Sequence, residues 1–245
     1  MTREDLIEEF NDTLCKAKTV YEKETKELLR NTKLYDNLDI RYKDTLTNGT
    51  NNIKAETKDT ISAILAQADK NKKICALNFA DDVMPGGLVL DGEKTQEECL
   101  CRVSNLYYSL MLDMNKRMYY SYNEQFDGKG SNRIIYSPDV IFFKDAEYKA
   151  VSPVKCDIIT CPAPKVDTAI ANEVINRMTC ILLAAKENKV DTLILGNWGC
   201  GAFGNDKKKF IMYWKKALEK VQLNEVLFAV LDDSEGISNV FGKTE

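Results

Sequence analysis

Two adjacent acids, Glu97 and Glu98, stand directly behind a glycine-containing stretch that runs from Pro85 to Gly92. Carboxylates can act as general acids and bases, and glycines let backbone N–H groups approach a ligand closely. The charged residues after the stretch predict the start of a helix, whose N-terminus favours bound anions. We therefore expect a ligand site here that can take a phosphate. Neighbouring residues on a helix point about 100° apart, so the two acids cannot share one role.

The same acids also have a purely structural explanation. Thr95 and Glu98 have the spacing of a capping box, and the helix dipole stabilises acids in a first turn. A cap of this kind is common and contributes only about 1 kcal/mol. From this stretch alone, the capping and the functional interpretations are equally supported.

The chain contains no histidine, which removes several classes of catalytic site. Ser-His and Cys-His nucleophiles, H-E-x-x-H zinc proteases and histidine acids or bases are all excluded. The eight cysteines include no C-x-x-C pair and mostly fall in apolar segments, where cysteine behaves as a small hydrophobe. We therefore expect no metal and no cofactor, and chemistry that relies on carboxylates and backbone dipoles.

Length and charge limit the remaining possibilities. The 245 residues, 44% of them hydrophobic, can bury a substantial core, and we expect one large domain with an appendage. A net charge of −4 gives no general attraction to nucleic acid or to an anionic membrane. No apolar run is long enough to span a bilayer, and residues 1–9 carry acids instead of a signal-peptide pattern. These features predict a cytoplasmic protein.

Hydrophobic periodicity predicts the elements that position the acids. Helical spacing predicts helices over residues 3–31, 57–68, 96–114, 167–188 and 206–221. Short apolar runs predict strands over 74–80, 133–136, 140–143, 156–160, 192–195 and 225–231. Residues 32–54 are polar and rich in turn formers, with one short strand expected near Ile40. Strands that alternate with helices indicate a layered α/β fold.

A second glycine loop, residues 196–204, also follows a predicted strand and precedes a predicted helix. In open α/β sheets ligands bind beyond the carboxyl ends of strands, so we expect the two loops to meet over one crevice. Successive N–H groups of the second loop can form an anion nest for a diphosphate. Neither loop has the spacing of a Rossmann fingerprint or of a Walker A loop.

The pattern P-G-G-x-x-x-x-G-x-x-x-Q-E-E-x-L-C-R, residues 85–102, resembles the signature of the bacterial-type poly(ADP-ribose) glycohydrolases, a branch of the macrodomain superfamily. The family's triple glycine stands here as Gly86, Gly87 and Leu88, and seven residues separate Leu88 from Gln96. Other segments resemble the family in the same order: Leu77–Ala80, Ser137–Val140, Ile158–Pro164, Leu195–Asn205 and Phe228–Asp232. The resemblance therefore covers most of the chain.

This resemblance implies a fold and a domain division. The fold is a macrodomain-like three-layer α/β fold, with a mixed β-sheet between helices. Residues 1–55 form an N-terminal helical accessory segment, and residues 56–245 form the macrodomain-like catalytic core.

The resemblance also implies roles for individual residues. Glu98 protonates the departing oxygen at the anomeric carbon of the terminal ADP-ribose and then activates water. Glu97 forms a hydrogen bond with a ribose hydroxyl, and Phe203 packs against the terminal ribose. Gly86 and Gly87 contact the ribose, and the diphosphate lies against Gly199, Cys200, Gly201, Ala202 and Gly204. Further substrate contacts are expected from Asn78, Ala80, Leu88 and Gln96.

The implied activity is hydrolysis of the ribosyl bond in poly(ADP-ribose) or ADP-ribosylated protein, with release of ADP-ribose. The alternative is a reader module that binds ADP-ribose without cleaving it. The implied partners are these substrates, with no direct nucleic-acid binding and no membrane.

Leu88 is the main departure from the family pattern. A leucine at this position could clash with the ribose or exclude a positive φ angle. We predict that its side chain points away, and that activity survives with a narrower substrate range.

Overall fold

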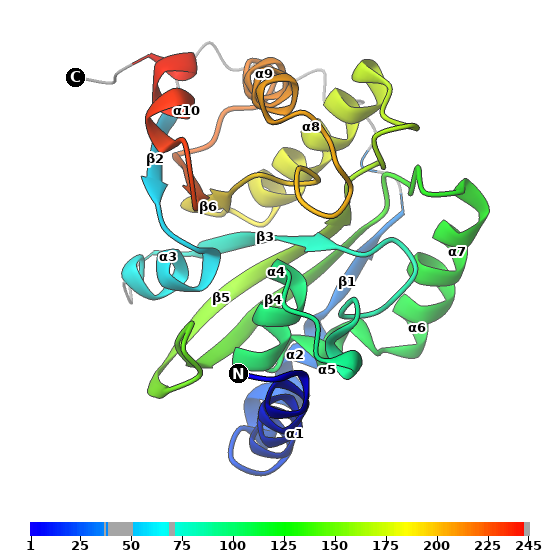
Figure 1. Cartoon of the computed structure of the whole chain (residues 1–245), viewed down its shortest axis with the longest axis vertical. Coiled ribbons are helices and arrows are strands. Elements are labelled where there is room, and N and C mark those ends of the chain that lie inside the picture. The colour runs from blue at the N-terminus through cyan, green and yellow to red at the C-terminus, as the bar shows by residue number, and fades with distance from the viewer. Residues whose placement is uncertain (37, 39–50, 69–71, 243–245) are drawn as a thin grey trace.

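A computed structural model describes residues 1–36, 38, 51–68 and 72–242 (Figure 1). Its centre is a seven-stranded mixed sheet in the order β1-β4-β5-β3-β6-β7-β2. The strands are β1 (Lys33–Tyr35), β2 (Asn52–Thr57), β3 (Ile74–Ala80), β4 (Ile134–Lys144), β5 (Ala150–Pro162), β6 (Thr192–Leu195) and β7 (Glu225–Val230). Strand β4 pairs antiparallel with β1 and β5, whereas every other neighbouring pair is parallel.

Helices cover both faces of this sheet, because successive side chains of its central strands point to opposite sides. Cys75 and Leu77 of β3 enter one core, while Ile74 and Ala76 enter the other. The first core lies under α8 (Ala171–Glu187), α9 (Lys207–Leu218) and α10 (Ser234–Phe241). The second lies under α1 (Arg3–Thr19), α2 (Glu22–Asn31), α3 (Thr60–Ala66), α4 (Gln96–Val103) and α5 (Leu106–Leu110). The predicted three-layer fold with a mixed sheet is confirmed.

The prediction of one helix over residues 3–31 was wrong, because the chain bends between α1 and α2. Tyr21 leaves the helical conformation, with φ −112° and ψ 33°. Its ring stacks on Phe143 with centroids 4.7 Å apart, and the Thr25 hydroxyl donates to the Ala17 carbonyl across the bend at 2.8 Å. These contacts fold α2 back on α1.

The prediction of one helix over residues 96–114 was also wrong, since α4 ends at Val103. Ser104 is extended and forms a bridge with Phe142, and the Asn105 side chain accepts the Ile141 N–H at 3.0 Å. Pairing with β4 therefore interrupts the helix before α5 begins. The chain continues through short helical turns: α6 (Asp113–Asn115), a π-helix (Lys116–Tyr120), α7 (Ser121–Asn123) and a 3-10 turn (Glu124–Phe126).

The two short strands predicted at 133–136 and 140–143 are one strand, β4, with a register shift between Ser137 and Val140. Asp139 takes the extra residue's position with φ +53°, and its N–H donates to Asp157 Oδ1 at 2.8 Å. The strand predicted at 156–160 is the longer β5. Strands β1 and β2, helix α10 and the short helical turns between Lys116 and Phe126 were not predicted.

The other predicted elements are confirmed, β3 and β6 with the predicted ends and the rest with shifted ends. Helices 57–68, 167–188 and 206–221 correspond to α3, α8 and α9, and strands 74–80, 192–195 and 225–231 to β3, β6 and β7. The strand expected near Ile40 lies outside the described residues. Strands β1 and β2 join the same sheet as the later strands, and the division after residue 55 remains a prediction. Within the described ranges, no helix combines the length and apolarity needed to cross a membrane.

Candidate active site

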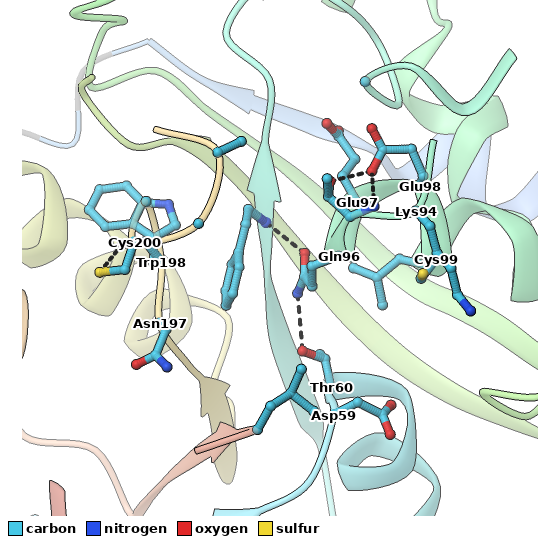
Figure 2. Close-up of a pocket in the computed structure, with 18 of the residues that line it drawn as sticks. Asp59, Thr60, Lys94, Gln96, Glu97, Glu98, Cys99, Asn197, Trp198 and Cys200 are labelled. Carbon is cyan, nitrogen blue, oxygen red and sulfur yellow. Dashed lines mark hydrogen bonds between the residues drawn. The ribbon is translucent and has the colours of Figure 1, made fainter. Parts of the chain in front are cut away.

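A cavity of about 890 Å³ lies at the carboxyl ends of the parallel strands. Its lining includes Ala80 at the end of β3, Asn197 after β6, Leu231 after β7 and Lys58 after β2. This is where open α/β sheets bind ligands, and the volume is in the range of small-molecule sites. Figure 2 shows Glu97 and Glu98 on one side, with Trp198 and Cys200 of the second glycine loop on the other. The two loops therefore meet over one cavity, as predicted.

Glu98 is buried, and both of its carboxyl oxygens are held by the protein. Oε1 accepts the Leu88 N–H at 3.0 Å. Oε2 accepts the Thr95 N–H at 3.0 Å and the Thr95 hydroxyl. The capping interpretation is thus confirmed, and the same side chain also lines the cavity. A carboxyl oxygen has two acceptor positions, so Oε1 keeps one that no described residue uses.

Glu97 is equally buried but has different partners. Its Oε1 accepts from Asn78 Nδ2 at 2.9 Å, and its Oε2 accepts the Asp81 N–H at 2.8 Å. Burial raises the pKa of Glu97 to about 8, because removal from water penalises the charged form more than these two hydrogen bonds favour it. Glu97 is therefore mostly protonated at neutral pH.

The backbone of the first glycine loop passes so close to Glu98 that a side chain at Gly87 would collide with its carboxylate. Gly86 and Gly87 have φ angles of +74° and +59°, which side chains rarely adopt. A Cβ on Gly87 would lie 2.3 Å from Glu98 Oε1, and one on Gly86 would lie 2.8 Å from the Tyr107 ring. Leu88 has an ordinary φ of −99°. The backbone at the third position therefore does not require a glycine.

The second glycine loop presents unused backbone donors. The Cys200 N–H donates to Asn197 and the Gly204 N–H to Gly201, which closes two turns. In the part of the chain that the structure describes, no acceptor takes the N–H groups of Gly199, Gly201, Ala202 and Phe203. These four groups are the strongest candidates for the predicted anion nest.

Two buried side chains hold the second loop in place. The indole N–H of Trp198 donates to the Cys161 carbonyl at 3.0 Å. The Asn205 amide donates to the carbonyls of Pro164 and Gly199 at 2.8 and 2.9 Å. The loop is thus tied to the end of β5 at one side and to itself at the other.

Most predicted site residues line the cavity, and three do not. Those that line it are Ala80, Gly87, Leu88, Gln96, Glu97, Glu98, Gly199, Cys200, Gly201, Ala202 and Phe203. Asn78 lies behind Glu97, Gly86 packs against Tyr107, and Gly204 closes the second loop. The roles assigned to all these residues remain predictions.

Gln96 lines the cavity, but its amide is already occupied on both sides. Nε2 donates to the Leu77 carbonyl at 2.8 Å and to the Thr60 hydroxyl at 3.2 Å, and Oε1 accepts the Phe79 N–H at 2.9 Å. Figure 2 shows it reaching from α4 to the start of α3. Gln96 therefore joins α4, β3 and α3 at the wall of the cavity.

Sequence reasoning missed the part of the lining at the start of α3, from Lys58 to Ile61. These residues follow the carboxyl end of β2, and the polar sequence of β2 shows no apolar run that would mark a strand. Recognition of β2 is the signal that would have placed them beside the site.

The macrodomain-like fold, with two buried acids facing one cavity, defines a class of ligand-binding α/β protein. The family model described as "Microbial-type PARG, catalytic domain" matches residues 5–145, more than half of the chain. The chain belongs to this family.

Solved structures of the same family support this assignment. A poly(ADP-ribose) glycohydrolase (PARG) from Deinococcus radiodurans in complex with ADP-ribose is 29% identical, with a TM-score of 0.77, and the match covers 88% of this chain and 95% of that one. A glycohydrolase from Thermomonospora curvata bound to the inhibitor ADP-HPD is also 29% identical, with a TM-score of 0.71, over 88% of this chain and 84% of that one. A search of curated proteins gave no match.

Proposed function

We propose that this protein is a poly(ADP-ribose) glycohydrolase, which hydrolyses the ribosyl bond of ADP-ribose units and releases ADP-ribose. Family membership and the ADP-ribose complex of the Deinococcus relative support this activity. The observation that carries the proposal is the arrangement of Glu97 and Glu98, two buried acids with separate partners on one cavity. A protein that only binds ADP-ribose needs no second acid in this position.

In this reaction the bond between the anomeric carbon and the leaving oxygen breaks, through an oxocarbenium-like state. The leaving oxygen takes up a proton, and water supplies the hydroxyl that replaces it. We assign both proton transfers to Glu98. Its Oε1 keeps a free position, whereas Oε2 already accepts twice from Thr95. Oε1 is therefore the oxygen that gives the proton to the leaving group and later takes one from water.

Glu97 has a different role in this proposal. With its pKa raised to about 8 by burial, Glu97 carries a proton at neutral pH. Both of its oxygens accept an N–H, so the remaining position that bears the proton is a hydrogen-bond donor. A neutral donor next to the reacting carbon can bind a ribose hydroxyl without placing a negative charge of its own beside Glu98. Glu97 would thereby orient the ribose.

The second glycine loop supplies binding in the same scheme. The free N–H groups of Gly199, Gly201, Ala202 and Phe203 suit the diphosphate of ADP-ribose. The substrates we propose are poly(ADP-ribose) and ADP-ribosylated protein. The absence of direct nucleic-acid binding and the cytoplasmic location remain predictions.

The test compares the wild type with Glu98→Gln on poly(ADP-ribose) and on mono-ADP-ribosylated protein. We expect wild type to release ADP-ribose and Glu98→Gln to be slower by about 10² to 10⁴-fold, the usual contribution of a general acid or base. Binding of ADP-ribose and the unfolding temperature are measured for both, because Glu98 also caps α4. Binding without release by either protein would instead identify a reader, and absence of binding would exclude both functions.

A further inference from the structure

Arg102 is a buried cation one helical turn beyond Glu98 on α4, with an exposed fraction of 0%. Its guanidinium pairs with no carboxylate of the described residues. It donates to two main-chain carbonyls, from Nε to Leu6 at 3.1 Å and from Nη2 to Val89 at 3.4 Å, and it also has a side-chain hydrogen bond with Tyr148. Burial of a charge without an opposite charge costs free energy, which hydrogen bonds must offset. The groups that accept from Arg102 therefore show which parts of the chain it holds together.

The Val89 carbonyl belongs to the short turn that completes the first glycine loop. Val89 follows Leu88, whose N–H holds Glu98 Oε1. The same carbonyl also accepts the Gly92 N–H at 3.3 Å, which closes the turn. Arg102 therefore donates a hydrogen bond to the residue that directly follows Leu88, whose N–H binds Glu98.

The Nε–H of the same guanidinium reaches the Leu6 carbonyl of α1, and α1 also packs against the loop. A Cβ on Gly92 would lie 2.6 Å from the Arg3 carbonyl, so the loop rests directly on the start of α1. Figure 1 shows the N-terminal helix close to α4 and α5. The Thr13 hydroxyl of α1 donates in turn to the Arg102 carbonyl. Helix α1, Arg102 and the loop thus form one connected unit.

Helix α1 has a second anchor that does not involve the loop. Lys144 at the end of β4 is buried, and its ammonium donates to Asp12 and to the Thr13 hydroxyl, each at 2.7 Å, and pairs with Glu9. Lys144 and Arg102 are therefore two buried cations that hold the same helix. Only Arg102 also reaches the glycine loop.

We propose that Arg102 is a positioning residue, which ties the first glycine loop to α1 and so keeps the Leu88 N–H on Glu98. In consequence, the N-terminal helix is part of the support of the active site, and not only a covering for the sheet. The effect on turnover rests on the proposed function of Glu98. The effect on the loop does not.

The test compares Arg102→Met with Lys144→Met, which removes the matched cation. Three quantities are measured below the unfolding temperature of each variant: amide hydrogen exchange at Leu88, the Kd for ADP-ribose and kcat on poly(ADP-ribose). For Arg102→Met we expect Leu88 exchange about tenfold faster and kcat about 100-fold lower, since small misplacements of catalytic groups cost that much. The Kd should change less than about threefold, because the second loop is untouched. Lys144→Met should lower the unfolding temperature but leave Leu88 exchange and kcat within about twofold of wild type.

Gly92→Ala is a second variant, in case Arg102→Met does not fold. Its methyl group would push the loop away from Arg3, so Leu88 exchange should rise without any change at Arg102. Unchanged Leu88 exchange in a folded Arg102→Met would overturn the proposal, as would an equal rise in Lys144→Met. If Arg102→Met does not fold, unchanged Leu88 exchange in Gly92→Ala would overturn it. If wild type binds ADP-ribose but does not hydrolyse poly(ADP-ribose), the proposed function fails, while Leu88 exchange still decides the role of Arg102.

Discussion

The two glycine loops at the cavity use their backbone N–H groups in opposite ways. In the first loop, the N–H groups of Gly87 and Leu88 are taken by the Met84 carbonyl and by Glu98. In the second, those of Gly201 and Ala202 have no acceptor among the described residues. Glycine serves the first loop by making room for a carboxylate and serves the second by leaving donors open. Two loops with the same position after a strand are therefore built for different tasks.

The two loops also differ in the titratable side chains that they bring to the cavity. The first loop faces Glu97 and Glu98, which can exchange protons. The titratable side chain within the second loop is Cys200, and burial raises the pKa of its thiol to about 11, so it stays neutral at physiological pH. We expect changes in the first loop to act on kcat and changes in the second to act on binding.

Gly87→Ala should have the largest effect of the substitutions that separate the loops. The methyl group would meet Glu98 Oε1 at 2.3 Å and force a side chain into φ +59°. The left-handed conformation costs about 1–2 kcal/mol, and Glu98 must leave the Leu88 N–H. We expect kcat on poly(ADP-ribose) to fall about 100-fold, with ADP-ribose binding changed much less. Steady-state kinetics and calorimetry measure the two quantities.

Gly128→Ala is the control for backbone strain alone. Gly128 has φ +77°, and the three atoms nearest to its added methyl all belong to the flexible end of the exposed Lys165 side chain. This variant should lose stability but keep its kcat. If Gly87→Ala retained full turnover, the first loop would not be positioning the acid.

Glu97→Gln tests the acidic side of the comparison through stability. Because burial raises the pKa of Glu97 from 4.5 to about 8, the folded state holds a proton that the unfolded state releases. Wild-type stability should therefore decline as pH rises from about 5 to about 8, by up to a few kcal/mol at about 1.4 kcal/mol per pKa unit. Glu97→Gln cannot ionise and should lack this decline.

Urea unfolding between pH 5 and pH 9 measures the effect, with Glu219→Gln as an exposed control. The control should follow the wild-type curve. Parallel curves for wild type and Glu97→Gln would mean that Glu97 is ionised in the folded protein across this range. The assignment of Glu97 as a neutral hydrogen-bond donor would then be wrong.

Sequence reasoning succeeded where burial leaves a local pattern. The central strand β3 is apolar except for Asn78, and the acids behind the first loop form a contiguous motif. Strand β2 lies at the edge of the sheet, so its residues are half exposed and polar, and it was missed. The end of α1 depends on the stacking of Tyr21 on Phe143, a contact between residues far apart in sequence. Such tertiary contacts leave no mark in a local window.

The candidate site divides in the same way. The acids and both glycine loops were predicted because each is a short segment with a recognisable composition. The partners of the acids were not, since the contact of Glu97 with Asn78 requires β3 and α4 to be placed against each other. The unequal use of backbone donors in the two loops also depends on geometry, because both loops are similarly rich in glycine.

Gly201→Ala should show a moderate effect confined to binding. A Cβ at this position would meet no atom of the described residues within 4 Å, so the methyl group would occupy the space beside the N–H groups of the second loop. We expect the Kd for ADP-ribose to rise about tenfold, or about 1.4 kcal/mol, with unchanged stability. Gly242→Ala, whose added Cβ also meets no atom of the described residues within 4 Å and does not line the cavity, should bind normally. Unchanged binding by Gly201→Ala would remove the second loop from the site.

Leu88→Gly should have the smallest effect and separates what the backbone of the first loop does from what its side chains do. The N–H of residue 88 holds Glu98, and the φ of −99° suits any residue, so the catalytic contact should survive. The side chain is 43% exposed at the cavity edge, where it can limit the space for a polymer. We expect turnover on poly(ADP-ribose) to rise about threefold relative to mono-ADP-ribosylated protein, within the usual effect of a small steric change in a pocket.

Leu90→Gly is the control, since Leu90 is 59% exposed in the same turn but does not line the cavity. Any loss of rigidity from glycine appears in both variants, so a ratio that changes only in Leu88→Gly comes from the leucine side chain. An unchanged ratio would mean that Leu88, like the glycine it replaces, contributes only its N–H group.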